Sequence, residues 1–247
     1  MTRTNLQPLR VAITGGTSGL GEALVTELLG RHAQVAFLAR HRDAVDRAHR
    51  RFERIAGPGR VHAIVGDVAR KDDIHPIAIQ IVAALGGLDV LINNASSLGP
   101  VPLAPLADTE CEELESALAT NLVGPFRLTK ALLGSLAASA RDGGHPLVIN
   151  ISSDAAVTPY PTWGAYGASK AALLHLTRIW DAELAAEGIR LVSVDPGDMA
   201  TPLHALAVPG ADPSTLKRPA VAAREIADLI ASRVITPDLA CRSEVLL

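Results

Sequence analysis

The sequence of 247 residues is 48% hydrophobic and 20% charged, a balance that supplies a globular core and excludes a mainly disordered chain. Its net charge of -3 and pI near 6.2 provide no basic surface for nucleic acid or an anionic membrane, which favours a small-molecule partner. No apolar run reaches the roughly 18 residues of a membrane span, and the polar start shows no targeting signal, so we expect a cytoplasmic protein.

The chain begins with a predicted buried strand, residues 9–14, that ends in a cluster of glycines. The cluster has the pattern T-G-x-x-x-G-x-G from Thr14 to Gly21, and a helical repeat of apolar residues starts within it. Glycines let a ligand approach the backbone, and the first N–H groups of a helix attract a pyrophosphate. A plain tight turn would use the same glycines, but the flanking strand and helix favour a dinucleotide. The predicted contacts are Gly15, Thr17, Ser18, Gly19, Leu20 and Gly21.

A second predicted strand, residues 34–39, carries Arg40 at its carboxyl end. A site specific for NAD has an acidic residue about 20 positions after the glycine turn, whereas an arginine stands here. Arg40 can pair with a 2′-phosphate, so we expect NADP(H) to be preferred over NAD(H). The alternative is that Arg40 to Arg42 form a solvated basic turn, with Asp43 as the N-cap of the next helix.

Two more buried strands are predicted over 61–66 and 88–92, with a helix over 72–85 between them. Asp67 follows the first of these strands and is a candidate N-cap for the helix. The segment Asn93-Asn94-Ala95-Ser96 follows the second strand.

A long amphipathic stretch over 108–140 predicts one helix with a disturbance near Gly124-Pro125. Proline has no N–H to donate to the residue four positions earlier, so the carbonyl of Asn121 is freed from helical pairing. An asparagine at a helix kink is usually structural, and this interpretation stays open for Asn121.

A fifth strand over 146–152 delivers Ser152 and Ser153 to its carboxyl end, the edge at which open parallel sheets bind ligands. A helix over 164–187 follows, in which Tyr166 and Lys170 leave the same face about one turn apart. A tyrosine that acts near neutral pH needs a pKa about three units below its usual value, and a neighbouring ammonium shifts it in that direction. Tyr160 lacks this arrangement, because Gly164 stands four residues later.

The last part of the chain contains a sixth strand over 189–194, a loop from Asp195 to Thr201 and a final helix over 221–234. We interpret about 198–218, which is rich in proline, as a mobile segment that covers the substrate. A short seventh strand in the tail, 242–247, completes the expected sheet.

The glycine pattern together with Tyr-x-x-x-Lys resembles the short-chain dehydrogenase/reductase family over nearly the whole chain. The resemblance and the alternation of strands and helices imply an α/β, Rossmann-type doubly wound fold. We expect a mainly parallel sheet of about seven strands with helices on both faces, in one dinucleotide-binding and catalytic domain over 1–247.

The resemblance also implies the roles of individual residues in an NADP(H)-dependent hydride transfer to or from a carbonyl or secondary alcohol. Tyr166 is the general acid or base, Lys170 lowers its pKa and binds the nicotinamide ribose, Ser153 steadies the substrate oxygen, and Asn121 holds a relay water. Further cofactor contacts implied by the family motifs are Asp67, Val68, Asn94, Ala95, Pro196, Gly197, Met199 and Thr201, besides Tyr166 and Lys170 themselves.

Two alternatives stay open at the level of sequence. The fold could serve an NAD(P)-binding sensor or interaction protein without turnover, or an epimerase or dehydratase. The cysteines, Cys111 and Cys241, and the eight scattered histidines indicate a reducing compartment and no metal site. We expect a homodimer or homotetramer that acts on a small, moderately apolar carbonyl or alcohol compound.

Overall fold

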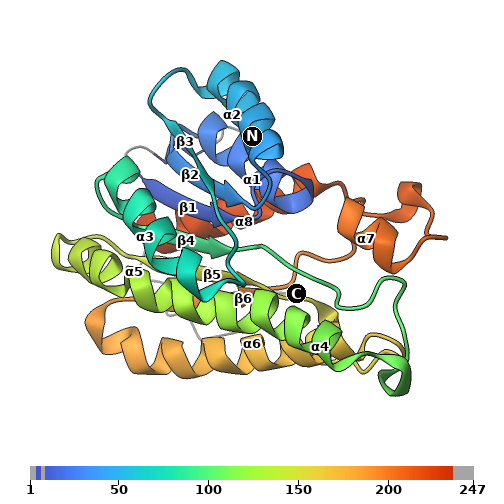
Figure 1. Ribbon diagram of the computed structural model, residues 1–247. Helices are drawn as coiled ribbons and strands as arrows, with labels where there is room; N and C mark the ends of the chain where they lie inside the picture. The colour runs from blue at the N-terminus through green and yellow to red at the C-terminus, as the bar shows by residue number, and fades with distance from the viewer. Residues whose placement is uncertain (1–3, 7–8, 236–247) are drawn as a thin grey trace.

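A computed structural model describes residues 4–6 and 9–235 and shows one parallel sheet between two layers of helices (Figure 1). The sheet has six strands in the order β3-β2-β1-β4-β5-β6, and every neighbouring pair is parallel. The strands are β1 (Arg10–Thr14), β2 (Gln34–Ala39), β3 (Val61–Val65), β4 (Val90–Asn93), β5 (Leu147–Ile151) and β6 (Arg190–Val194). The helices are α1 (Gly19–Gly30), α2 (Arg42–Ala56), α3 (Lys71–Leu85), α4 (Cys111–Leu118), α5 (Gly124–Arg141), α6 (Gly164–Leu184), α7 (Pro202–Ala207) and α8 (Pro219–Ile235).

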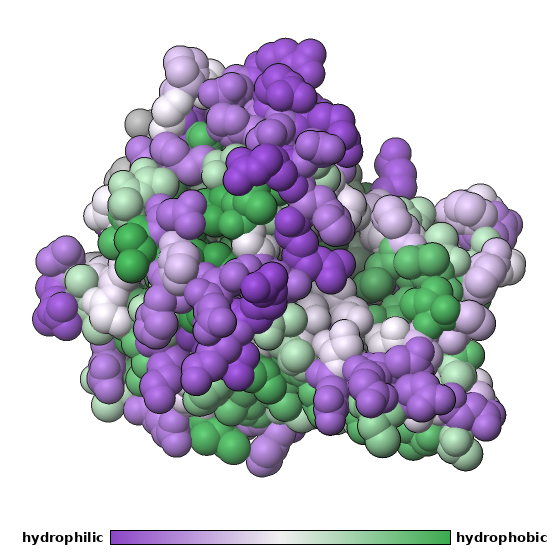
Figure 2. All heavy atoms as spheres, in the orientation of Figure 1, coloured by the Kyte–Doolittle hydropathy of each residue, from purple (hydrophilic) through white to green (hydrophobic). Residues whose placement is uncertain are grey.

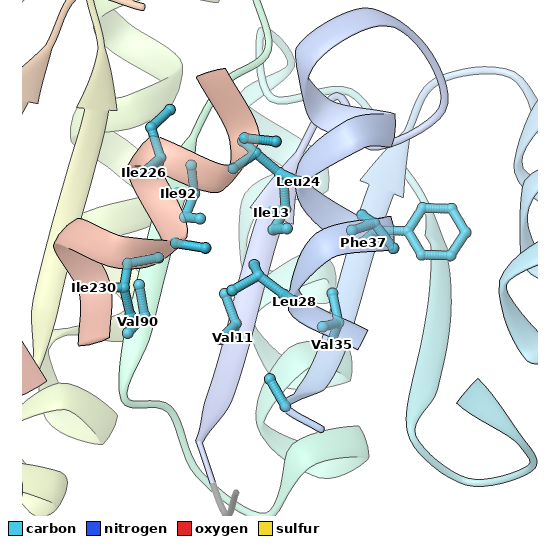
Figure 3. Close-up of a cluster of buried hydrophobic side chains, with 14 of the residues drawn as sticks. Val11, Ile13, Leu24, Leu28, Val35, Phe37, Val90, Ile92, Ile226 and Ile230 are labelled. Atoms are coloured by element: carbon cyan, nitrogen blue, oxygen red, sulfur yellow. The ribbon is translucent and has the colours of Figure 1, made fainter. Parts of the chain in front are cut away.

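The two faces of the sheet have separate apolar cores, because successive side chains of a strand point to opposite faces. Val11 belongs to the core under α1, α2 and α8, whereas Ala12 belongs to the core under α3, α5 and α6. Figure 3 shows Leu24 and Leu28 of α1 packed over the strands of the first core, beside side chains of α8. Strands buried on both faces explain why the sequence shows continuous apolar runs rather than alternation.

The strand order fixes the place of a ligand site. β1 lies between β2 and β4, so the chain winds outward in both directions from this strand. In open parallel sheets, ligands bind beyond the carboxyl ends of the strands at such a switch point. The glycine turn follows β1, and the residues predicted for catalysis follow β4 and β5 or begin α6.

The predicted doubly wound fold is confirmed, with six strands in the described part of the chain. The predicted seventh strand falls on 242–247, outside the described residues. The stretch predicted as one helix over 108–140 forms α4 and α5, joined by a π-helical turn at Ala119–Val123. Within the described residues, no helix has the length and apolar character of a membrane span.

Two predicted helix caps are wrong. α2 begins at Arg42 with His41 at the N-cap, so Asp43 lies inside the first turn. α3 has Arg70 at its N-cap, and Asp67 Oδ1 instead accepts a hydrogen bond from Ala69 N at 3.0 Å in the preceding turn. α2 begins one residue before Asp43, and α3 begins four residues after Asp67. The sequence pattern alone does not fix the first residue of a helix this closely.

Candidate active site

The glycine turn after β1 is held close to the loop after β4. Gly15 has a φ of 70°, and its N–H donates to Leu38 O at 2.8 Å. Asn94 Nδ2 donates to Thr14 O at 2.9 Å and to Gly15 O at 3.2 Å. A Cβ atom on Gly21 would overlap the Gly15 carbonyl oxygen and lie 2.6 Å from Asn94 Nδ2. The turn therefore requires glycine, and its backbone is fixed by contacts from two strands.

The N-terminus of α1 faces the same edge. Ser18 is the N-cap in an extended conformation, and its side chain makes no capping hydrogen bond. The first N–H groups of a 12-residue helix carry partial positive charge and suit a phosphate. Together, the glycine turn from Gly15 to Gly21 and the N-terminus of α1 form a cradle that fits a dinucleotide pyrophosphate.

The loop after β6 forms the opposite wall of the cradle. A Cβ atom on Gly19 would lie 3.3 Å from Thr201 Cγ2, so this loop reaches the glycine turn. Thr201 Oγ1 accepts from His204 N at 3.1 Å and caps α7. Asp198, earlier in the same loop, does not cap this helix, and its side chain is 78% exposed.

The segment from 198 to 218 leaves the body of the protein and returns at one place. Lys217 N donates to Asp198 O at 2.9 Å, and Ala200 N donates to Lys217 O at 3.0 Å. These two hydrogen bonds close the base of an excursion that contains α7, which projects from the sheet in Figure 1. Pro196, Gly197 and Met199 precede or form this base.

The other residues predicted for the cofactor lie along the carboxyl edge of the sheet. Arg40 is exposed at the end of β2 and forms no ion pair with any other described residue. Val68 is buried after β3, and Ala95 N donates to Thr14 Oγ1 at 2.9 Å. The structure thus brings the predicted positions from β1, β2, β3, β4 and β6 to one side of the molecule.

Tyr166 and Lys170 leave the same face of α6, and both are enclosed. Their exposed fractions are 7% and 2%. Lys170 Nζ donates to Ile151 O at 2.7 Å, at the end of β5, and lies 5.5 Å from the centre of the Tyr166 ring. The lysine is therefore anchored to the strand that carries Ser153.

Ser153 begins a short turn in which its hydroxyl has two partners. Its Oγ donates to Asp154 Oδ1 at 3.0 Å and accepts from Ala155 N at 3.2 Å. Asp154 also accepts a hydrogen bond from the exposed Tyr160 hydroxyl, at 2.6 Å. The Ser153 hydroxyl proton is thus directed toward the Asp154 carboxylate.

The pKa of Tyr166 is raised in the structure, whereas a lowered pKa was predicted. Burial raises the pKa of Tyr166 to about 12, although hydrogen bonding with Ser153 and Ser96 lowers it; Asp195 raises it further. Burial lowers the pKa of Lys170 to about 8, against the attraction of Asp195. The predicted lowering of the tyrosine pKa by Lys170 does not arise from these protein contacts, because the ammonium donates to a backbone carbonyl instead of the phenol oxygen.

Asn121 lies in the π-helical turn and is 1% exposed. Its Oδ1 accepts from Ser97 N at 2.8 Å, and its Nδ2 donates to Ser97 O at 2.7 Å and to Ser169 Oγ at 2.8 Å. The side chain therefore fastens the loop after β4 to α6. The predicted relay water concerns the main chain of this residue and stays a prediction.

Three polar residues of this site were not among the predicted site residues. These are Ser96, which acts to lower the pKa of Tyr166, and Asp154 and Asp195, which raise it. Each follows directly after β4, β5 or β6, so the rule that parallel sheets bind at this edge could have found them. Burial and the neighbouring carboxylates raise the pKa of Asp195 itself.

A metal centre and a surface hollow are two other kinds of site that a protein of this size can carry. The described residues contain no group of three or more potential ligands that could hold a metal ion. A hollow of about 850 Å³ lies on α2, lined by Arg47, Arg50, Arg51, Glu53, Arg54 and Pro58. None of the residues discussed above lines it, so it is separate from the predicted chemistry.

The chain is similar to known proteins over most of its length. Residues 10–210 match the family described as short chain dehydrogenase. The chain is 30% identical over 195 residues to the glucose 1-dehydrogenase of Gluconobacter oxydans. The aligned residues cover 79% of this chain and 71% of that protein.

Two solved structures share the fold. The 3-ketoacyl-(acyl-carrier-protein) reductase of Brucella melitensis, complexed with NADH, is 23% identical with a TM-score of 0.85 over 98% of this chain and 97% of that one. The alcohol dehydrogenase of Thermococcus sibiricus, complexed with 5-hydroxy-NADP, is 24% identical with a TM-score of 0.82 over 97% and 96%.

Proposed function

The chain belongs to the short-chain dehydrogenase/reductase family and is an NAD(P)-dependent oxidoreductase, and from this premise we propose that it uses NADP(H) to interconvert a carbonyl and a secondary alcohol. The observation that carries the proposal is the group at the carboxyl edge of β5. There Ser153 follows β5, Lys170 is bonded to the end of the same strand and Tyr166 lies one turn before it, at the edge of the sheet where the glycine turn also lies.

The residues of the cradle would hold the cofactor in the following way. The N–H groups at the start of α1 would bind the pyrophosphate, Arg40 the 2′-phosphate, and Thr201 the carboxamide. When bound, the nicotinamide supplies the hydride for reduction or accepts it in oxidation.

The proton moves through the chain's own residues. In reduction, the Tyr166 hydroxyl gives its proton to the substrate oxygen, and in oxidation the phenolate takes it back. Ser153 donates a hydrogen bond to the same oxygen, which stabilises the charge that develops there. Lys170 supplies positive charge near the phenol, and this charge must act together with that of the bound cofactor because burial alone raises the pKa of Tyr166 to about 12.

The preference for NADP(H) rests on Arg40. Its guanidinium is exposed and charged at the end of β2, where a carboxylate would be needed for the ribose hydroxyls of NAD. The two solved structures described above contain NADH and an NADP derivative, so the fold accommodates both. The alternative, a solvated basic turn, predicts equal binding of the two cofactors.

The substrate class is inferred from the surface around Tyr166. Leu98, Ala155 and Tyr166 form a small apolar cluster, against which Trp163 and Leu203 pack. Figure 2 shows further apolar side chains over α7, beside a hollow in the surface; Leu206 and Val208 of this region are exposed. A small, moderately apolar substrate fits this lining, and the segment 198–218 would cover it.

The test is a titration with NADPH and, in parallel, NADH, followed by nicotinamide fluorescence. We expect tighter binding of NADPH, and we expect Arg40→Ala to weaken NADPH binding by roughly 10- to 100-fold, the usual effect of losing a charged hydrogen bond. Arg50→Ala is the matched control, since Arg50 is an exposed arginine in the middle of α2. Equal affinities for the two cofactors would overturn the NADP assignment.

Turnover is tested separately with Tyr166→Phe. This variant should bind NADPH like the wild type and lose roughly 100- to 10,000-fold in kcat with a carbonyl substrate. Unchanged biological activity in this variant would support the alternative of a sensor without turnover. A homodimer or homotetramer in the cytoplasm completes the proposal and is checked by light scattering and fractionation.

A further inference from the structure

Asp154 contacts the hydroxyl of Ser153 and follows it directly in the chain. Ser153 Oγ donates to Asp154 Oδ1 at 3.0 Å and accepts from Ala155 N at 3.2 Å. The Tyr160 hydroxyl donates to the second carboxylate oxygen, Asp154 Oδ2, at 2.6 Å. Within the described chain, each oxygen of this carboxylate thus accepts one hydrogen bond from a side chain.

The Asp154 carboxylate lies in the region of the sheet edge where Tyr166 is enclosed. The ring of Trp163 lies 6.3 Å from that of Tyr160 and 5.7 Å from that of Tyr166, measured between centroids. Ala155, the residue after Asp154, packs in the same apolar cluster as Tyr166. Tyr160 is 42% exposed and Asp154 is half-buried, so a ligand can reach the carboxylate from solvent.

The proposed reaction requires Ser153 to turn its proton away from Asp154. Ala155 N still donates to Ser153 Oγ after this rotation, so only the hydroxyl proton moves, from the carboxylate to the substrate oxygen. Asp154 Oδ1 then loses its donor, and a hydrogen bond to a carboxylate is roughly twice as strong as one to a neutral carbonyl. A ketone without another polar group therefore binds in competition with the contact between Ser153 and Asp154.

We propose that Asp154 determines substrate specificity, because its Oδ1 accepts a hydrogen bond from a hydroxyl on the carbon next to the reacting carbonyl. The substrate is then an α-hydroxy ketone in reduction and a vicinal diol in oxidation. The substrate hydroxyl takes the place of Ser153 at Oδ1 while Ser153 donates to the ketone oxygen. This inference rests on the proposed function and narrows its substrate class.

The geometry favours a hydroxyl on the adjacent carbon. The ketone oxygen would lie about 2.8 Å from Ser153 Oγ, and Asp154 Oδ1 lies 3.0 Å from the same atom. Both acceptors are thus neighbours of one hydroxyl, so a donor close to the ketone oxygen can reach Oδ1. Tyr160 occupies Oδ2, which leaves Oδ1 as the oxygen available to the substrate.

The reaction balances without a proton from Asp154. In reduction the ketone carbon takes the hydride and the ketone oxygen takes the Tyr166 proton, so the product is a vicinal diol. The second hydroxyl of the substrate and the Ser153 hydroxyl keep their protons. Asp154 stays a carboxylate that only accepts hydrogen bonds.

The kinetic test compares two ketones of the same shape, 1-hydroxybutan-2-one and pentan-3-one, in which a methyl group replaces the hydroxyl. It uses whichever nicotinamide cofactor supports turnover. We expect kcat/KM of the wild-type enzyme to be roughly 10- to 100-fold higher for the hydroxy ketone, the usual effect of one hydrogen bond to a charged group. Equal values for the two ketones would overturn the inference.

Asp154→Ala should remove this difference, in large part by raising kcat/KM for pentan-3-one, because the Ser153 hydroxyl is released. A merely structural role would lower the values for both ketones together, and an unchanged ratio would therefore contradict the inference. Asp154→Asn retains an uncharged acceptor and should keep a difference of roughly 2- to 10-fold.

Asp198→Ala is the matched control, since Asp198 is an exposed carboxylate in the loop after β6. This variant should keep the wild-type ratio of the two kcat/KM values. Loss of the difference in Asp198→Ala would assign the substrate hydroxyl to that carboxylate instead of Asp154.

A binding measurement does not depend on turnover and so separates this inference from the proposed function. Each ketone is titrated into Tyr166→Phe saturated with NADPH while nicotinamide fluorescence is followed. 1-Hydroxybutan-2-one should bind roughly 10-fold more tightly than pentan-3-one, and Asp154→Ala in this background should remove the difference. Equal affinities, or binding of neither ketone, would overturn the inference even where reduction of other carbonyl compounds supports the proposed function. Failure to bind a nicotinamide cofactor would refute the proposed function, and the inference with it.

Discussion

Lys170 is a charged residue that the fold encloses almost completely. Burial lowers its pKa from 10.5 to about 8. Between these values the unfolded chain binds more protons than the folded one, so the free energy of unfolding rises with pH in this window. We expect the cofactor-free protein to be more stable at pH 9.5 than at pH 7 by roughly 2 kcal/mol, as measured by urea unfolding. Tyr166 does not reverse the trend there, because its pKa is raised above 10 in the fold.

The matched variants are Lys170→Met and Lys130→Met, the second on the exposed side of α5. Lys170→Met should be more stable than the wild type at pH 7 and should lose the rise toward pH 9.5. Lys130→Met should retain it. A wild-type stability that is flat over this range would show that the ammonium is better solvated than its burial indicates.

At the scale of elements, Asp181 fastens α6 to β6. Its Oδ1 accepts from Arg190 Nε and Leu191 N, both at 2.8 Å, and its Oδ2 accepts from Arg190 Nη2 at 2.8 Å. Burial acts to raise its pKa, but the hydrogen bonds from Arg190 and Leu191 outweigh it and hold the pKa below 3.8. A depressed carboxyl pKa contributes stability above the unfolded value, and this contribution is lost as the pH falls below about 4.

Asp181→Asn should therefore destabilise the protein by about 1.5–3 kcal/mol at pH 7, since it removes a charged partner of Arg190. The loss should become smaller as the pH falls toward 3, because the carboxylate of the unfolded chain takes up a proton below about pH 4 and the stabilising contribution of the ionised group declines. Glu183→Gln, on the exposed face of the same helix, is the control and should change stability little. Urea unfolding at both pH values measures the difference, and an equal loss at pH 3 and pH 7 would contradict the electrostatic argument.

At the scale of the whole molecule, cofactor binding should stabilise the fold, because the cradle joins turns and loops from β1, β4 and β6. At a cofactor concentration 100 times the Kd, the free energy of unfolding should rise by about 2.7 kcal/mol. Gly21→Ala should abolish this gain, since its methyl group would overlap Gly15 and Asn94. Thermal unfolding with and without NADPH is the measurement.

Gly134→Ala is the matched substitution for this test. Gly134 lies inside α5, and no atom lies within 4 Å of a Cβ added there. Alanine should stabilise the helix by up to about 1 kcal/mol and leave the cofactor-dependent gain intact. If Gly21→Ala were stabilised by NADPH as much as the wild type is, the cofactor would bind at a place other than this cradle.

The sequence by itself determined the order of strands and helices, the glycine turn and the pairing of Tyr166 with Lys170 on one helix face. These features are local, since apolar runs, glycine spacing and helical periodicity depend on residues close together in the chain. The π-helical turn at Ala119–Val123 was anticipated as a disturbance, but its length was not, because the proline excludes one hydrogen bond without choosing the replacement.

The tertiary structure alone decided which groups surround the phenol. Asn121 and Ser169 are 48 residues apart, yet their side chains form a hydrogen bond at 2.8 Å. The pKa values of Tyr166 and Lys170 likewise depend on how much water the neighbouring elements exclude and on where Asp195 lies. A four-residue spacing predicts that a lysine is near a tyrosine, whereas only packing determines whether its ammonium meets the phenol oxygen or, as here, the Ile151 carbonyl.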